Sequence, residues 1–252
     1  MWRLSLWRLS LPGVLALILT GCVSAKSVMR AEGQYELGSA YFKEGDHESA
    51  VKTFREATEL DPRNWRAWNA LGLSYIAKGD VPSAEDAFDR ALHINPGEGE
   101  ILVNLGALQL KTGRVEDAVA TFELATKDLD YRNQSLVLSN LSRALYEARA
   151  YDAALSRAQE AVRRSPALCE GWFHVGLIQE AKGQPAAALE AYRTLEERCP
   201  NEAVGAQLRV GCLLVKGGEA EDGVAELQAL IAQMPGTPFA DQARLCLAGA
   251  QN

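Results

Sequence analysis

Residues 31–62 read AEGQYELGSAYFKEGDHESAVKTFREATELDP, and residues 65–96 read WRAWNALGLSYIAKGDVPSAEDAFDRALHINP. When the two stretches are aligned, many positions carry the same residue, always 34 residues apart. An internal period of this size indicates a repeat architecture in which each copy is one supersecondary unit. The shared pairs are Leu37/Leu71, Gly38/Gly72, Tyr41/Tyr75, Gly45/Gly79, Asp46/Asp80, Ala50/Ala84, Phe54/Phe88, Ala57/Ala91 and Pro62/Pro96.

The pattern continues almost to the end of the chain. Copies begin near residues 31, 65, 99, 135, 169 and 204. The fourth copy is degenerate, because the Leu-Gly pair of the first three copies becomes Leu141-Ser142. Residues 238–249 predict one further helix, which would cap the open end of the array.

This pattern resembles the tetratricopeptide repeat, in which each copy is a helical hairpin. The resemblance implies an all-α fold over residues 31–250: a right-handed superhelical solenoid of six repeats with a C-terminal capping helix. Small residues at repeat positions 8, 20 and 27 allow the two helices to approach closely. Glycine at position 15 suits a left-handed turn, and proline at position 32 ends the second helix.

In this family the first helix of each repeat lines a concave groove, mostly through positions 2, 5, 9 and 12. These positions place some polar residues there, among them Arg66, Asn69 and Glu100, but most are apolar or aromatic. Such a groove suits an extended or amphipathic segment of a partner protein. The alternative is that several of these side chains only pack between neighbouring repeats. The predicted groove residues are Tyr35, Phe42, Leu73, Ile76, Val103, Leu110, Leu136, Tyr146, Phe173, Leu177 and Leu208.

The N-terminus has the features of a bacterial export signal. Arg3 and Arg8 precede an apolar run over residues 9–19, which as a helix would span about 16 Å, too short for a membrane of about 30 Å. The following Leu-Thr-Gly-Cys over residues 19–22 resembles a lipobox, in which the cysteine is acylated and becomes the first residue of the mature chain. We therefore expect residues 1–21 to be removed as a lipoprotein signal peptide, Cys22 to carry lipid, and residues 22–30 to form a short linker. A plain signal peptide with a coincidental cysteine is the alternative.

The predicted acylation of Cys22 indicates where in the cell envelope the protein is located. Three acyl chains on Cys22 would anchor the protein durably, since each buried methylene contributes about 0.8 kcal/mol. Val23 follows the cysteine where an aspartate would retain enteric lipoproteins at the inner membrane. By that analogy we expect an outer-membrane protein that faces the periplasm.

Charge and chemistry exclude several functions. The chain has a net charge of -7, and loss of Arg3 and Arg8 would make it -9, so nucleic acid is not an expected partner. His47, His93 and His174 lie in different repeats and form no metal-binding or nucleophile pattern. We expect no catalysis, no metal and no cofactor apart from the covalent lipid.

Four cysteines lie in the last third of the chain. Cys169 and Cys199 occupy positions 1 and 31 of the fifth repeat, at the same end of a hairpin, and Cys212 corresponds to Cys246 in the capping helix. In an oxidising compartment these places predict the bridges Cys169–Cys199 and Cys212–Cys246. Four free, buried thiols are the alternative.

An acylated solenoid of this length and repeat number is similar to the pilotin lipoproteins of type IV pilus systems (the PilF, PilW and Tgl kind). The resemblance implies an assembly factor for pilus biogenesis and pilus-dependent motility. It would bind monomers of the outer-membrane secretin, promote their multimerisation, and be monomeric outside that complex. Two alternatives are a lipoprotein of the outer-membrane protein insertion machinery and a lipoprotein regulator of a cell-wall synthase.

Overall fold

The computed structural model describes residues 24–249, so the predicted signal peptide and Cys22 lie outside the described part. Within this part the chain forms thirteen α-helices and one short 3-10 helix at Pro200–Glu202. The predicted all-α solenoid is therefore confirmed. The helices are α1 (Ala25–Lys43), α2 (His47–Leu60), α3 (Trp65–Lys78), α4 (Val81–Ile94), α5 (Gly99–Lys111), α6 (Val115–Ala125), α7 (Gln134–Glu147), α8 (Tyr151–Arg164), α9 (Cys169–Ala181), α10 (Pro185–Arg198), α11 (Val204–Gly217), α12 (Ala220–Gln233) and α13 (Pro238–Gly249).

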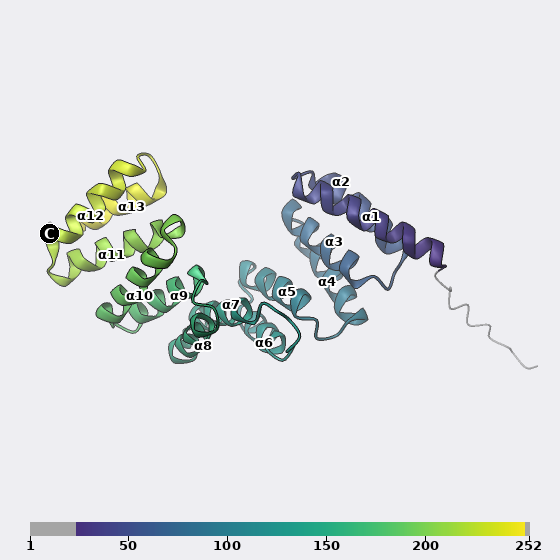
Figure 1. Ribbon diagram of the computed structural model, residues 1–252, viewed down its shortest axis with the longest axis horizontal. Helices are drawn as coiled ribbons and strands as arrows, with labels where there is room; N and C mark the ends of the chain where they lie inside the picture. Colours follow the sequence, from purple (N-terminus) through teal and green to yellow (C-terminus); the bar gives the residue numbers. More distant parts are fainter. Residues whose placement is uncertain (1–23, 250–252) are drawn as a thin grey trace, which may run out of the picture.

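Consecutive helices pair as antiparallel hairpins, which stack into an open arch (Figure 1). At the middle of the arch α5 and α7 lie toward the inside, and α6 and α8 lie outside. The odd-numbered helices also contact one another from repeat to repeat, as α5 contacts α7 and α7 contacts α9. The arch ends with α13, which packs on α11 and α12.

The spacing within each hairpin is set by a bulky side chain that lies on a glycine. A Cβ added to Gly72 in α3 would lie 2.6 Å from the ring of Phe88 in α4, and one on Gly106 would lie 2.7 Å from the Phe122 ring. Both rings are fully buried. The glycine is therefore a contact requirement, because any side chain would overlap the ring. Equivalent pairs are Gly38–Phe54, Gly176–Tyr192 and Gly211–Leu227.

The degenerate fourth repeat lacks the glycine–ring pair. Ser142 takes the place of the glycine, and Ala158 in α8 takes the place of the aromatic ring. Both are buried, and the Ser142 hydroxyl donates to the carbonyl oxygen of Ala154 at 2.9 Å. Because no ring faces Ser142, that position need not be a glycine, and the serine hydroxyl is hydrogen-bonded.

Two tryptophans join neighbouring hairpins. The indole Nε1 of Trp68 donates to the carbonyl oxygen of Pro62 at 3.1 Å, and Trp172 does the same to Pro166 at 3.0 Å. In each case the proline ends one repeat and the tryptophan belongs to the first helix of the next. The bond fixes the stacking of the repeats while leaving the large apolar ring in the interface.

The first helix begins earlier than the sequence predicts. Residues 25–30 are helical, although they were expected to be part of a linker. The reason is Ser24, whose side chain accepts a hydrogen bond from the backbone N–H of Ser27 and caps the helix. The Ser27 hydroxyl in turn contacts the carbonyl oxygen of Leu60 at the end of α2 at 2.5 Å, which ties the added turns to the first hairpin.

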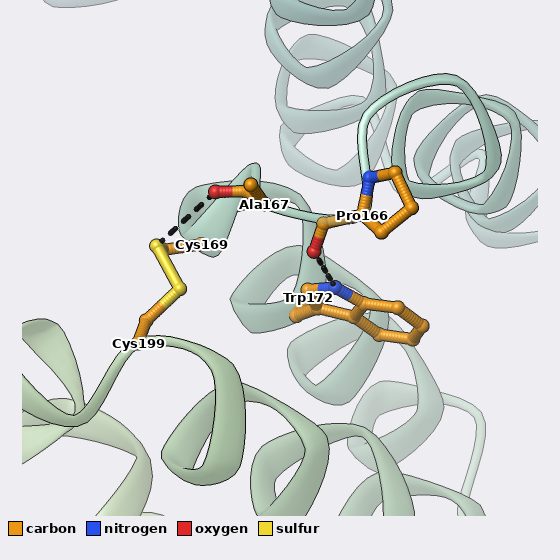
Figure 2. Close-up of a disulfide and its surroundings, with 5 residues drawn as sticks. All are labelled: Pro166, Ala167, Cys169, Trp172 and Cys199. Atoms are coloured by element: carbon orange, nitrogen blue, oxygen red, sulfur yellow. Dashed lines mark hydrogen bonds between the residues drawn. A yellow bond between two sulfur atoms is a disulfide. The ribbon is translucent and has the colours of Figure 1, made fainter.

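Both predicted disulfides are present. Cys169 at the start of α9 is bridged to Cys199 at the end of α10, with Cα atoms 5.9 Å apart, and Cys212 in α11 is bridged to Cys246 in α13 at 5.6 Å. Figure 2 shows the first bridge beside the Trp172–Pro166 bond. The bridged Cys169 sulfur carries no proton, so its 3.4 Å approach to the Ala167 oxygen is a packing contact.

The bridges strengthen the C-terminal end of the solenoid. They close loops with sequence separations of 30 and 34 residues, each worth about 3–4 kcal/mol on a chain-entropy model. A terminal repeat has a stacking neighbour on one side only, so it lacks one of the interfaces that stabilise an inner repeat. Covalent closure offsets that deficit.

The contact between Gly72 and Phe88 yields the first prediction. We expect Gly72→Ala to lower the free energy of unfolding by about 1–3 kcal/mol, because the new methyl group overlaps a buried ring. Gly33→Ala is the matched control: nothing lies within 4 Å of its added Cβ, and alanine is favoured over glycine in a helix by about 0.5–1 kcal/mol. Urea denaturation followed by far-UV circular dichroism measures both, and equal midpoints would contradict the prediction.

The fourth repeat yields a second prediction. Arg149 has φ of 59°, at the place where Gly79 has 78° in the second repeat. Since the left-handed conformation costs a non-glycine residue about 1–2 kcal/mol, we expect Arg149→Gly to raise the free energy of unfolding by about 0.5–1 kcal/mol. Arg149→Ala keeps the unfavourable φ and should change little. A glycine variant no more stable than the alanine variant would show that the conformation carries no cost.

Candidate functional site

A cavity of about 180 Å³ opens between the first helices of the first three repeats. It brings together three of the predicted groove residues, Tyr35 and Phe42 from α1 and Leu73 from α3. These side chains are half-buried, and the two from α1 pack on the core around Phe54. The full lining is Tyr35, Ser39, Phe42, Lys43, Phe54, Arg66, Asn69, Ala70, Leu73 and Glu100.

The aromatic side chains that α1 contributes to the cavity pack on the hydrophobic core of the first hairpin. The Tyr35 ring lies 5.9 Å from the Phe54 ring, tilted by 51°. The Ser39 hydroxyl, which also lines the cavity, donates to the Tyr35 carbonyl oxygen at 2.8 Å. Burial, followed by the negative charge of Glu100, raises the pKa of the Tyr35 phenol above its ordinary value. The phenol therefore stays neutral and remains a hydrogen-bond donor.

One wall of the cavity is polar. The Asn69 amide donates to Glu100 at 2.9 Å, and the Asn104 amide donates to Asn69 at 3.0 Å. Asn69 is 2% exposed, whereas Glu100 is exposed, so this polar link runs from the interior to the surface. Arg66 stands at the same cavity, with its guanidinium 5.6 Å from the Trp65 ring. The site thus combines an apolar floor with two cations, Lys43 and Arg66, and one carboxylate.

The same repeat positions form a second polar link further along. The hydroxyl of Ser139 lies 3.2 Å from Nδ1 of His174, and Glu170 lies 3.7 Å from its Nε2. Burial is the main effect that lowers the pKa of His174, so the imidazole is neutral at neutral pH. Ser139, Glu170 and His174 correspond in repeat position to Asn69, Glu100 and Asn104. Both sets bridge the first helices of adjacent repeats.

The remaining predicted groove residues do not all face outward. Val103 and Leu208 are 8% and 6% exposed and belong to core clusters between helices, so neither offers a surface to a partner. Val103 packs against Val137 of the next hairpin, and Leu208 packs in a cluster that includes Ala243 of the capping helix α13. The others are half-buried and stay on the first helices, outside this cavity: Ile76, Leu110, Leu136, Tyr146, Phe173 and Leu177.

The sequence missed the hydrogen bonds of the polar wall. Repeat positions indicated Arg66, Asn69 and Glu100 on this face, but Asn104 was not among them. Its position lies one helical turn beyond Glu100, which places the two side chains on one side of α5. This spacing of four residues could have predicted that Asn104 lies on the same face as Glu100.

Two other features bear on function. Within residues 24–249, no cluster of three or more His, Cys, Asp or Glu residues could hold a metal ion. None of the helices in this range combines the length and apolar character that a membrane span requires.

Comparison with protein families identifies the repeat. A family described as tetratricopeptide repeat matches residues 35–99 and 140–203, and a second model of the same description matches residues 75–130. Together these matches cover more than half of the chain. The protein belongs to the tetratricopeptide repeat family.

Solved structures of other tetratricopeptide proteins share its architecture. PilW, described as a widely conserved type IV pilus biogenesis factor, superposes with a TM-score of 0.79 at 19% identity, over 85% of this chain and 98% of PilW. PilF from Pseudomonas aeruginosa gives 0.76 at 19% identity, over 87% of this chain and 99% of PilF. YrrB, described as having an unusual peptide-binding site, gives 0.57 at 20% identity, over 74% of this chain and 99% of YrrB. No curated protein matches this tetratricopeptide chain in sequence. At these identities the likeness establishes the fold.

Proposed function

We propose that this protein is an outer-membrane lipoprotein that acts as an assembly factor in type IV pilus biogenesis. It binds monomers of the secretin and promotes their multimerisation in the outer membrane, and through this it supports pilus-dependent motility. The observation that carries the proposal is the extent of the match: the solenoid superposes on PilW and PilF over 98% and 99% of their lengths. Those proteins have the same arrangement almost from end to end, not one shared hairpin.

The cavity between α1 and α3 is the proposed contact for the secretin. Its volume of about 180 Å³ lies below the ~300 Å³ at which small-molecule pockets begin, so it fits a side chain better than a metabolite. An amphipathic segment could place one large apolar side chain against Tyr35, Phe42 and Leu73 while its polar face meets Arg66 and Glu100. The charged pair at the rim would fix the direction of the bound segment.

The proposed acyl chains on Cys22 would hold the protein at the membrane in which the secretin assembles. A tethered protein meets its partner at an effective concentration set by the tether, which can exceed the bulk concentration by orders of magnitude. Secretin monomers carry surface that must enter the bilayer. A tethered groove would cover part of that surface until subunits join. The tetratricopeptide chain itself is expected to remain monomeric and to bind without catalysis or cofactor.

The groove gives a direct prediction. We expect Phe42→Glu to abolish secretin binding, because a carboxylate would be placed against the apolar floor of the cavity. Leu73→Ala, which is milder, should weaken binding about tenfold while leaving the fold intact. Leu124→Glu is the matched control, since Leu124 is 51% exposed on α6, away from the cavity.

Purified variants are tested for secretin binding by surface plasmon resonance, and cells are tested for heat-resistant secretin oligomers. Far-UV circular dichroism verifies that each variant is folded. Normal oligomers in a folded Phe42→Glu strain would rule out this cavity as the contact.

The anchor gives a separate prediction. We expect Cys22→Ser to eliminate incorporation of labelled palmitate and to release the protein from outer-membrane fractions. Secretin oligomers should then fall sharply, although the isolated variant still binds the secretin. Palmitate incorporation that persists in the variant would contradict acylation at Cys22.

A further inference from the structure

The first helix is longer than the repeat requires. α1 has 19 residues, whereas the equivalent helix of the second repeat, α3, has 14. The added turns precede residue 31, where the repeat pattern begins. Figure 1 shows this end of α1 projecting past its neighbours, at the opposite end of the molecule from α13. The hairpin alone therefore does not account for residues 25–30.

The added turns expose large apolar side chains. Met29 is 74% exposed and Val28 is 43% exposed. Further along the same helix Leu37 is 45% exposed, while the equivalent Leu71 in the second repeat is 3% exposed. Leu71 is covered by the preceding hairpin, where it packs with Val51 and Phe54. Within residues 24–249 no hairpin precedes α1, so its exposed apolar side chains have no such cover in this range.

The charge of these turns is opposite to that of the chain. Lys26 and Arg30 are exposed, and neither forms an ion pair with any residue that the structure describes. The first acidic residue of the helix is Glu32, whereas the whole chain has a net charge of -7. Lys26 also lies in the first helical turn, where the helix dipole favours acidic residues. Local helix energetics therefore do not explain this lysine.

We propose that the N-terminal turns of α1, defined by Lys26, Val28, Met29 and Arg30, dock on an anionic lipid surface. Basic side chains that flank exposed apolar ones are the pattern of an interfacial helix segment. The basic pair meets lipid phosphates, and Met29 enters the boundary between headgroups and acyl chains. This inference rests on the proposed acylation of Cys22, which brings the segment to the bilayer.

Chain length supports a lipid surface as the occupant. Two extended residues from Cys22 to Ser24 reach at most about 7 Å, and the helix from there to Met29 adds about 8 Å. The Cα atom of Met29 therefore lies within about 15 Å of the Cα atom of Cys22, and Lys26 lies closer still. This reach lets the segment lie on the headgroups. The Debye length in a cell is about 8 Å, so the basic side chains interact with the lipid phosphates only when the segment is docked there.

Docking would also orient the groove. Tyr35 follows Met29 by six residues on the same helix, a rise of about 9 Å. A lipid-only tether allows the solenoid to rotate freely about Cys22, whereas a docked α1 holds the cavity close to the membrane surface. The partner-binding residues would then face a segment that emerges from the bilayer.

A depth measurement on the acylated, full mature chain tests the proposal. The environment-sensitive dye NBD is attached at Met29→Cys, since Cys22 carries lipid and the other four cysteines are bridged. The matched control carries the dye at Leu129→Cys, where the native side chain is 87% exposed in the middle of the arch. Both proteins are placed on phosphatidylcholine vesicles, with and without phosphatidylglycerol, that contain an acyl-chain quencher. We expect quenching at residue 29 on the anionic vesicles and none at residue 129.

Charge neutralisation completes the test. Lys26→Gln with Arg30→Gln should reduce the docking equilibrium about 30-fold, because each basic side chain near an anionic surface contributes about fivefold. Flotation with the vesicles reports acylation independently of docking. A protein that fails to float overturns the acylation and this inference with it, whereas a floating protein with an unquenched dye at residue 29 overturns docking alone.

The other possible occupants of the surface give distinct results. A dye response that depends on protein concentration without vesicles would assign the surface to a second copy of the chain. A response that requires added secretin would assign it to that partner. Equal quenching on neutral and anionic vesicles would remove the role of the basic pair. Each of these results overturns the proposal.

Discussion

Everything in this solenoid depends on the contact between a glycine on the first helix of a hairpin and a bulky side chain on the second. The ring of Phe88 occupies the space that a Cβ on Gly72 would need, and it is fully buried there. The helices can approach only because the glycine has no side chain, and they are held together because the ring fills the gap. In the fourth repeat this pair is replaced by a small residue on each helix, Ser142 and Ala158, and both are buried. The glycine is required only where the residue that faces it is bulky.

The first and last hairpins each have a neighbouring hairpin on one side only, and their open sides differ. At the C-terminal end α13 covers the last hairpin, and the Cys212–Cys246 bridge fixes it there. At the N-terminal end of the described range no helix precedes α1, and Leu37 is left partly exposed where Leu71 is buried. One end is closed by covalent chemistry, whereas the other presents apolar and basic side chains next to the proposed lipid anchor. Together with the proposed acylation, this asymmetry would give the molecule a defined direction relative to a membrane.

The concave face is less uniform than an apolar groove. At the first repeats an apolar floor around Phe42 stands beside the amide chain of Asn69 and Asn104. The same repeat positions carry Ser139 and His174 further along, where they link α7 to α9. Satisfied polar links of this kind specify how adjacent first helices stack, because an unpaired buried amide would be costly. The proposed recognition site and the contacts that set the stacking of the repeats thus lie on one surface, with the cavity at the first three repeats.

The sequence alone determined the hairpins, their number and the pairing of the cysteines, because a fixed period maps each residue onto a place in a repeating unit. Cys169 and Cys199 could be paired in this way from their positions within one hairpin. Only the tertiary structure decided which apolar residues of the first helices stay accessible. Val103 and Phe42 both occupy concave positions, yet Val103 is buried by stacking and Phe42 lines a cavity. The physical reason is that a repeat pattern fixes the contacts inside a hairpin, whereas exposure depends on how closely the next hairpin packs, and that distance is set by side chains far apart in the sequence.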